Sequence, residues 1–63
     1  ENNPMNNEEI SVRIRELNKE KTNILLDMHN AKSYGDNDKW WQLYQRYRDA
    51  ISKINELHML KEL

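Results

Sequence analysis

The sequence predicts an all-α protein, an antiparallel hairpin of two long helices over about residues 7–33 and 38–60. Three observations predict this fold. Apolar residues recur in steps of three and four through both segments, which is the spacing of one helix face. The single glycine, Gly35, stands between the segments, and the single proline, Pro4, stands before them. The chain has 63 residues, which limits it to one domain. It has no cysteine, which excludes disulfides.

The first predicted helix begins after Asn6. Asparagine is a favourable N-cap, and Glu9 follows at the position of a capping-box acid. Met5 and Ile10 occupy the positions of a hydrophobic staple around this cap. The apolar face then repeats as a heptad through Ile10, Ile14, Leu17, Ile24, Met28 and Ala31. Lys21 interrupts the heptad, and we expect its aliphatic stem to lie along the contact between the helices, here called the seam.

Gly35 is suited to the left-handed conformation that ends a helix, so the first helix is predicted to stop near residues 33–34. We expect Asp38 to cap the second helix, because the helical pattern runs unbroken from Lys39. The buried face of the second helix is predicted to be centred on Trp40, Tyr44, Tyr47, Ile51 and Ile54, with Leu43, Ala50 and Leu57 widening it on one side. A short turn makes the helices antiparallel, and reflection about it predicts seam partners whose numbers add to about 71 or 72, such as Leu17 with Ile54.

Residues 1–5 are expected to form a flexible leader, and residues 6–63 a single helical-hairpin domain. Met5 is a candidate initiator, which makes residues 1–4 either a remnant of a longer product or an ordinary N-terminus. The formal net charge is −1 and 33% of the residues are charged. No apolar run reaches the length of a membrane span. We therefore expect a cytoplasmic protein. Frequent Asn, Lys, Ile and Glu residues suggest an AT-rich coding sequence, which would suit a bacterial or phage accessory protein.

A two-helix hairpin with neither disulfide nor metal is expected to be marginally stable alone. Several apolar residues also fall outside the predicted seam: Val12, Leu25, Leu26, Trp41, Met59, Leu60 and Leu63. We therefore expect a second buried surface. The chain is predicted to form a homodimer, as a four-helix bundle, or to dock on a larger protein.

Aromatic and basic residues are densest between Trp40 and Arg48. Trp, Tyr and Arg dominate the binding energy of protein interfaces, although Trp40, Tyr44 and Tyr47 could equally form the core of the hairpin. The sequence thus favours a small non-enzymatic regulatory, inhibitor or adaptor protein that binds through a helix face. The predicted partner-binding residues are Leu25, Leu26, Trp41, Tyr44 and Arg48.

Two alternatives remain open. A nucleic-acid-binding hairpin would use Lys39, Trp41, Arg46 and Arg48, although the near-neutral charge disfavours it. A phosphorelay protein, acting in phosphotransfer or as a phosphatase, would use His29 or Asp49. His29 with Lys32 resembles the His-x-x-Lys stretch of histidine phosphotransfer helices. Of the two histidines, His29 is expected to face solvent, and His58 is expected to be half-buried on the seam. No cofactor, metal or catalytic site is predicted, and residues 36–38 are interpreted as helix caps.

Overall fold

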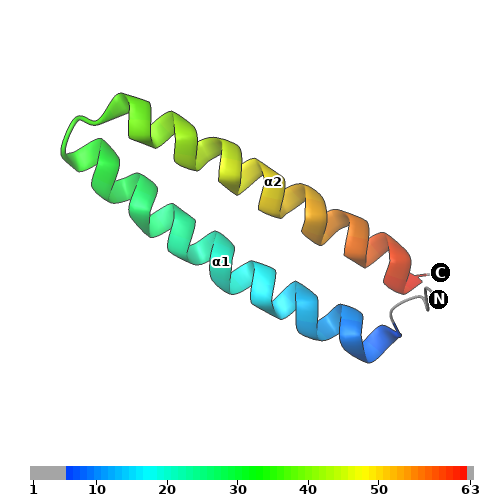
Figure 1. Cartoon of the computed structure of the whole chain (residues 1–63). Helices are drawn as coiled ribbons and strands as arrows, with labels where there is room; N and C mark the ends of the chain where they lie inside the picture. Colours follow the sequence, from blue (N-terminus) through cyan, green and yellow to red (C-terminus); the bar gives the residue numbers. More distant parts are fainter. Residues whose placement is uncertain (1–5, 63) are drawn as a thin grey trace, which may run out of the picture.

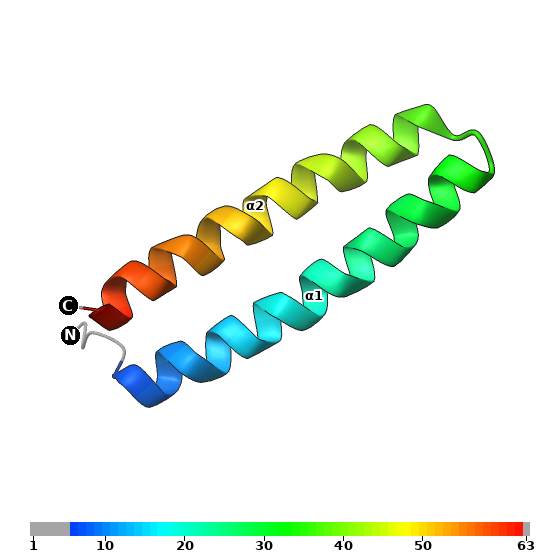
Figure 2. The same ribbon diagram turned by 180° about the vertical axis from the view of Figure 1, so that it is seen from behind.

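The computed structural model describes residues 6–62 and consists there of two α-helices, α1 (Asn7–Ser33) and α2 (Asn37–Glu62). The helices lie side by side and antiparallel, joined by a tight turn at one end (Figure 1), and the view from behind shows the same pairing (Figure 2). The all-α hairpin and the bounds of the first helix are confirmed, whereas α2 begins slightly earlier and ends slightly later than predicted. The predicted leader, the staple residue Met5 and the apolar Leu63 lie outside the described residues.

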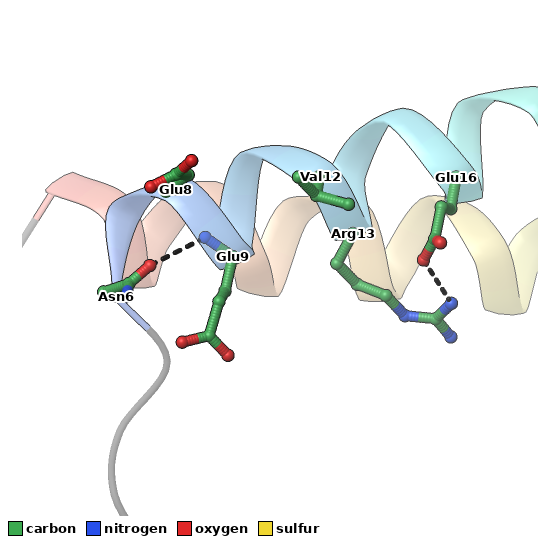
Figure 3. Close-up of a pocket in the computed structure, with 6 residues that line it drawn as sticks. All are labelled: Asn6, Glu8, Glu9, Val12, Arg13 and Glu16. Atoms are coloured by element: carbon green, nitrogen blue, oxygen red, sulfur yellow. Dashed lines mark hydrogen bonds and ion pairs between the residues drawn. The ribbon is translucent and has the colours of Figure 1, made fainter.

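Asn6 caps α1 as the sequence predicts. Its side-chain oxygen Oδ1 accepts a hydrogen bond of 2.8 Å from the backbone N–H of Glu9 (Figure 3). This bond satisfies one of the amide groups that have no partner in the first turn of a helix. Glu8 and Glu9 place negative charge at the positive end of the helix dipole, so local chemistry fixes where α1 begins.

The turn ends α1 through two backbone hydrogen bonds around Gly35. The N–H of Gly35 donates to the carbonyl of Lys32 at 3.1 Å, and the N–H of Asp36 donates to the carbonyl of Ala31 at 2.9 Å. These are the paired bonds of a Schellman motif, which needs a residue with positive φ after the helix. Gly35 supplies it with φ of 74°. The predicted role of this glycine is therefore confirmed.

The cap of α2 is Asp36, and the prediction of Asp38 is wrong. The carboxylate Oδ1 of Asp36 accepts a hydrogen bond of 3.1 Å from the N–H of Lys39. Because the Schellman bonds hold Asp36 next to the end of α1, the chain re-enters helix at Asn37 without further linker. Asp38 lies in the first turn of α2, where its charge favours the helix dipole but its side chain is not the cap.

The seam is filled by two clusters of buried apolar side chains. The cluster at the open end joins Ile10, Ile14 and Leu17 of α1 to Ile54 and Leu57 of α2. The cluster near the turn joins Ile24, Met28 and Ala31 to Leu43, with Trp40, Tyr44 and Tyr47 packed against it. Leu17 and Ile54 share a cluster, as do Ile24 and Tyr47, so the predicted antiparallel register is confirmed.

The centre of the seam on α2 differs from the predicted one. Leu43 and Ala50 are 5% and 4% exposed, whereas Trp40, Tyr44 and Tyr47 are only half-buried. A small residue such as Ala50 lets the helix backbones approach closely, while a ring on the same line would hold them apart. The aromatic residues therefore lie beside the centre line and cover its margin.

His58 is exposed, so the prediction of a half-buried histidine on the seam is wrong. It lies near the open end, where Leu57, the preceding residue, turns into the cluster instead. His29 and the half-buried Lys21 are placed as predicted. Across residues 6–62, neither helix combines the length and the apolarity that crossing a membrane requires.

Replacing Asp36 is expected to cost more stability than replacing Asp38. Asp36→Ala removes the cap bond to Lys39 and should lower the free energy of unfolding by about 1 kcal/mol. Asp36→Asn keeps a capping oxygen and should lie close to wild type. Chemical denaturation of each variant at one protein concentration measures the effect, and a larger loss in Asp38→Ala than in Asp36→Ala would contradict the assignment.

Candidate protein-binding face

The heptad positions of the two helices divide the hairpin into two edges. The core residues Ile14, Lys21 and Met28 of α1 and Trp40, Tyr47 and Ile54 of α2 occupy position a. Ile10, Leu17, Ile24 and Ala31, with Leu43, Ala50 and Leu57, occupy position d. Positions e and g then flank the seam on opposite sides, and each edge carries the same letter from both helices.

Shared hollows confirm how the edges pair. Lys32 at position e of α1 lines a hollow together with Trp40 of α2. Asp27 at position g of α1 lines a different hollow with Lys39 at position g of α2. The e side of α1 therefore faces the a and e side of α2, and the g positions of the two helices lie on the other side of the seam.

The half of the e side nearer the turn is mainly apolar and is here called the aromatic edge. It consists of Leu25, Trp40, Trp41, Tyr44, Tyr47 and Ile51. Trp40, Tyr44 and Tyr47 pack on the core cluster near the turn, Ile51 is half-buried, and Leu25 and Trp41 are 43% and 58% exposed. The exposed fraction of the side chains thus rises from the d positions to the aromatic edge, where an apolar strip is in contact with water.

The rings of the aromatic edge are held against one another. The rings of Trp40 and Tyr44 are stacked, with centroids 5.3 Å apart and planes at 7°. Trp41 meets both edge-on, at 4.9 Å from Trp40 and 5.7 Å from Tyr44. The guanidinium of Arg48 lies over the Tyr44 ring at 6.0 Å from its centroid, within the range of a cation–π contact. The cluster is therefore preorganised, because each large side chain has its rotamer restricted by a neighbour.

The g side is polar and is here called the charged edge. It carries Arg13, Glu20, Asp27, Lys39, Arg46 and Lys53, and one exposed apolar residue, Leu60, at the open end. Residues of both signs line one hollow of about 170 Å³ there, including Glu20, Arg46 and Asp49. Mixed charges on a hydrated edge need no partner, and ion pairs at such sites contribute little to stability.

Four of the five predicted partner-binding residues come together on one face. Leu25, Trp41, Tyr44 and Arg48 lie on or beside the aromatic edge. Leu26 does not join them. It occupies position f, on the side of α1 that faces away from the seam, and is 59% exposed.

The residues of the two alternative functions are divided between the edges. Lys39 and Arg46 belong to the charged edge, while Trp41 and Arg48 belong to the aromatic edge, since residues two apart on a helix do not share a face. The four residues of the nucleic-acid alternative therefore do not form a single site. The two phosphorelay candidates are separate positions: His29 is exposed on α1, and Asp49 lines the hollow of the charged edge.

Sequence reasoning did not include Trp40, Tyr47 and Ile51 in the candidate face, since all three were assigned to the core. The signal that could have found them is the pair of heptad stripes on α2. When two neighbouring stripes are apolar, the one with smaller residues takes the centre, and the other becomes an edge.

A further hollow, of about 400 Å³, lies along the outer surface of α1 and is lined by residues of that helix and its cap (Figure 3). Its walls are Asn6, Glu8, Glu9, Val12, Arg13 and Glu16. Arg13 pairs with Glu16 at 3.4 Å across it. Among the residues described, no group of His, Asp and Glu side chains is arranged to hold a metal ion.

Comparison of the chain with protein-family models, with curated proteins and with solved structures finds no match. The candidate face therefore stands on its own geometry.

Truncating Trp41 should leave the hairpin folded. Trp41→Ala removes two edge-on ring contacts at an exposed position and should cost about 1 kcal/mol or less. Leu17→Ala, at a position only 2% exposed, should cost about 2–5 kcal/mol because it opens a cavity in the seam. Thermal denaturation followed by circular dichroism compares the two, and equal losses would show that Trp41 is part of the core.

Proposed function

We propose that the protein is a small non-enzymatic binding module, a regulator, inhibitor or adaptor, that acts by protein–protein contact through its aromatic edge. The observation that carries the proposal is the exposure of Trp41, 58%, within a cluster of ordered rings. Tryptophan is the residue most enriched at binding hot spots, and Tyr44 and Arg48 beside it belong to the same enriched class. A partner on this edge would remove from water the apolar area that two helices leave uncovered.

The choice of edge follows from chemistry as well as exposure. Other exposed apolar side chains, such as Val12, Leu26 and Met59, lie at f positions spread along the outer surfaces of the helices. Scattered apolar residues are normal on protein surfaces. Leu25 and Trp41 differ because they extend a strip of half-buried side chains that already forms one side of the seam.

A second copy of the chain is one partner that would cover the apolar area of the aromatic edge. Two hairpins placed with their aromatic edges together would form a four-helix bundle with twofold symmetry, in which each copy covers the other. Support for this arrangement comes from the length of the strip and from the absence of a second layer within 6–62. A larger partner protein would use the same edge.

Loss of the Trp41 side chain is expected to remove one specific partner. Tagged wild-type protein and the Trp41→Ala variant are used to capture proteins from the native host. Leu26→Ala is the matched control, because Leu26 and Trp41 are almost equally exposed, at 59% and 58%, but only Trp41 lies on the aromatic edge. A band retained by wild type and Leu26→Ala and absent with Trp41→Ala supports the proposal. Identical bands from all three proteins would contradict it.

Self-association is expected to depend on the same residue. Sedimentation equilibrium over a micromolar concentration series should show an average mass that rises from 7.7 kDa towards a dimer. The Trp41→Ala variant should remain at the mass of the monomer. A well-folded wild-type monomer across the whole series would exclude the homodimer and leave a larger partner as the occupant.

A further inference from the structure

Charge is unevenly distributed around the hairpin, although the formal net charge is −1. The a, e and b positions, which form or border the aromatic edge, carry the basic residues Arg15, Lys21, Lys32, Arg48 and Lys61. From Glu9 to Lys61, every acidic residue falls in the turn or on the c, f and g positions. The acidic Glu8 is at a b position, but it lies in the first turn of α1, at the end of the hairpin furthest from the aromatic cluster.

Within residues 6–61, no ion pair joins a basic group of this edge to a carboxylate. In the stretch from residue 6 to residue 61, the one ion pair joins Arg13 to Glu16, away from the aromatic edge. Lys21 is half-buried in the seam and Arg48 lies over the Tyr44 ring, so both cations are positioned by apolar surroundings. The edge therefore combines an apolar strip with unneutralised positive charge along its margins.

The shape of the edge fits a helix. Two antiparallel helices present a shallow groove along each edge, and a third helix packs there as in a three-helix bundle. The apolar strip from Trp40 to Ile51 spans about 17 Å at the rise of an α-helix, and the basic positions from Arg15 to Lys32 span about 25 Å. An amphipathic helix of four to five turns, about 17 residues long, would cover both.

Building on the binding function proposed above, we propose that the aromatic edge is a docking groove for an acidic amphipathic helix of a partner protein. The apolar face of that helix packs on Leu25, Trp41 and Tyr44. Its flanking Asp and Glu residues approach Lys32 on one margin and Arg48 on the other. Complementary charge at the rim of an apolar contact selects the partner and speeds association.

A second copy is the weaker occupant of this groove. In a twofold dimer the same edge meets itself, so the basic margins of both copies are brought together. Like charges in an interface oppose association, and added salt screens that repulsion. The homodimer should therefore tighten as salt rises, whereas the complex with an acidic helix should weaken. The two occupants respond to ionic strength with opposite signs.

A nucleic acid is a poorer match to the same edge. Phosphate contacts require basic groups along a backbone, but here Leu25 and Ile51 occupy the strip between the basic margins. Aliphatic side chains gain from a dry apolar partner rather than from phosphates or base edges. Two of the remaining basic residues, Lys39 and Arg46, are on the charged edge beside Asp27 and Asp49.

The test uses synthetic helical peptides of about 20 residues, with Leu on one face and that face flanked by Glu, by Gln or by Lys. Binding to the full chain is followed by Trp fluorescence at several salt concentrations. The Glu-flanked peptide should bind at least tenfold more tightly than the Lys-flanked peptide, roughly as three favourable surface charge pairs allow. Its affinity should fall as salt is added.

Two triple variants with the same change in net charge separate the edges. Arg15→Glu, Lys32→Glu and Arg48→Glu reverse the margins of the aromatic edge at exposed positions. Lys39→Glu, Arg46→Glu and Lys53→Glu reverse the charged edge and serve as the control. The first triple variant should lose about tenfold or more in affinity for the Glu-flanked peptide and gain affinity for the Lys-flanked one. The control should change affinity by less than about threefold, with circular dichroism showing both variants folded.

Several outcomes would overturn the inference. Equal losses of affinity for the Glu-flanked peptide in the two triple variants would mean that the peptide is attracted by the net charge of the protein rather than by the aromatic edge. Tighter binding of duplex DNA or of anionic phospholipid vesicles than of the Glu-flanked peptide, with the same dependence on the first triple variant, would assign the edge to a different partner. Trp41-dependent binding of the Gln-flanked peptide that neither triple variant affects would refute the acidic partner but keep the binding edge. Failure of every peptide to bind in a Trp41-dependent way would count against the proposed function itself.

Discussion

A seam between two helices is one layer thick, and this constraint decides what the rest of the hairpin presents to solvent. Each helix buries side chains only at or next to its a and d positions, because no third element covers the flanks within the described chain. Large side chains then have to lie at the margin, where they cover the seam without holding the backbones apart. The aromatic edge is thus a direct consequence of packing Leu43 and Ala50 at the centre of α2.

The turn sets the register on which this arrangement depends. Asp36 takes part in both helices, since its N–H closes the last turn of α1 and its carboxylate caps the first turn of α2. The turn is therefore short and fixed by hydrogen bonds, which determines which residue of α2 lies opposite each residue of α1. That register brings Leu25 of α1 to the same edge as the rings of α2, although Leu25 has no aromatic neighbour in the sequence.

Much of this fold could be predicted from the sequence, because strong local signals coincide. The cap at Asn6, the heptad of α1 and the single glycine each specify the same hairpin. The cap of α2 could not be chosen reliably among residues 36–38, since all three residue types are good caps and the Schellman bonds decide between them. The centre of α2 was ambiguous for a similar reason. Two adjacent stripes are apolar, and only the fit of side-chain volumes across the seam selects one.

The overall composition of the chain does not reveal how charge is distributed between the two edges. A net charge of −1 argues against a basic surface when the chain is treated as a whole, and that argument fails once charges are assigned to edges. Acidic residues collect on the side where Arg13, Arg46 and Lys53 already balance them, so the positive charge of the other edge is not cancelled locally. Over distances of about 10 Å at physiological salt, a partner responds to the nearest edge rather than to the total. The proposed binding of an acidic partner therefore depends on which heptad positions carry the charges, and the even overall balance does not oppose it.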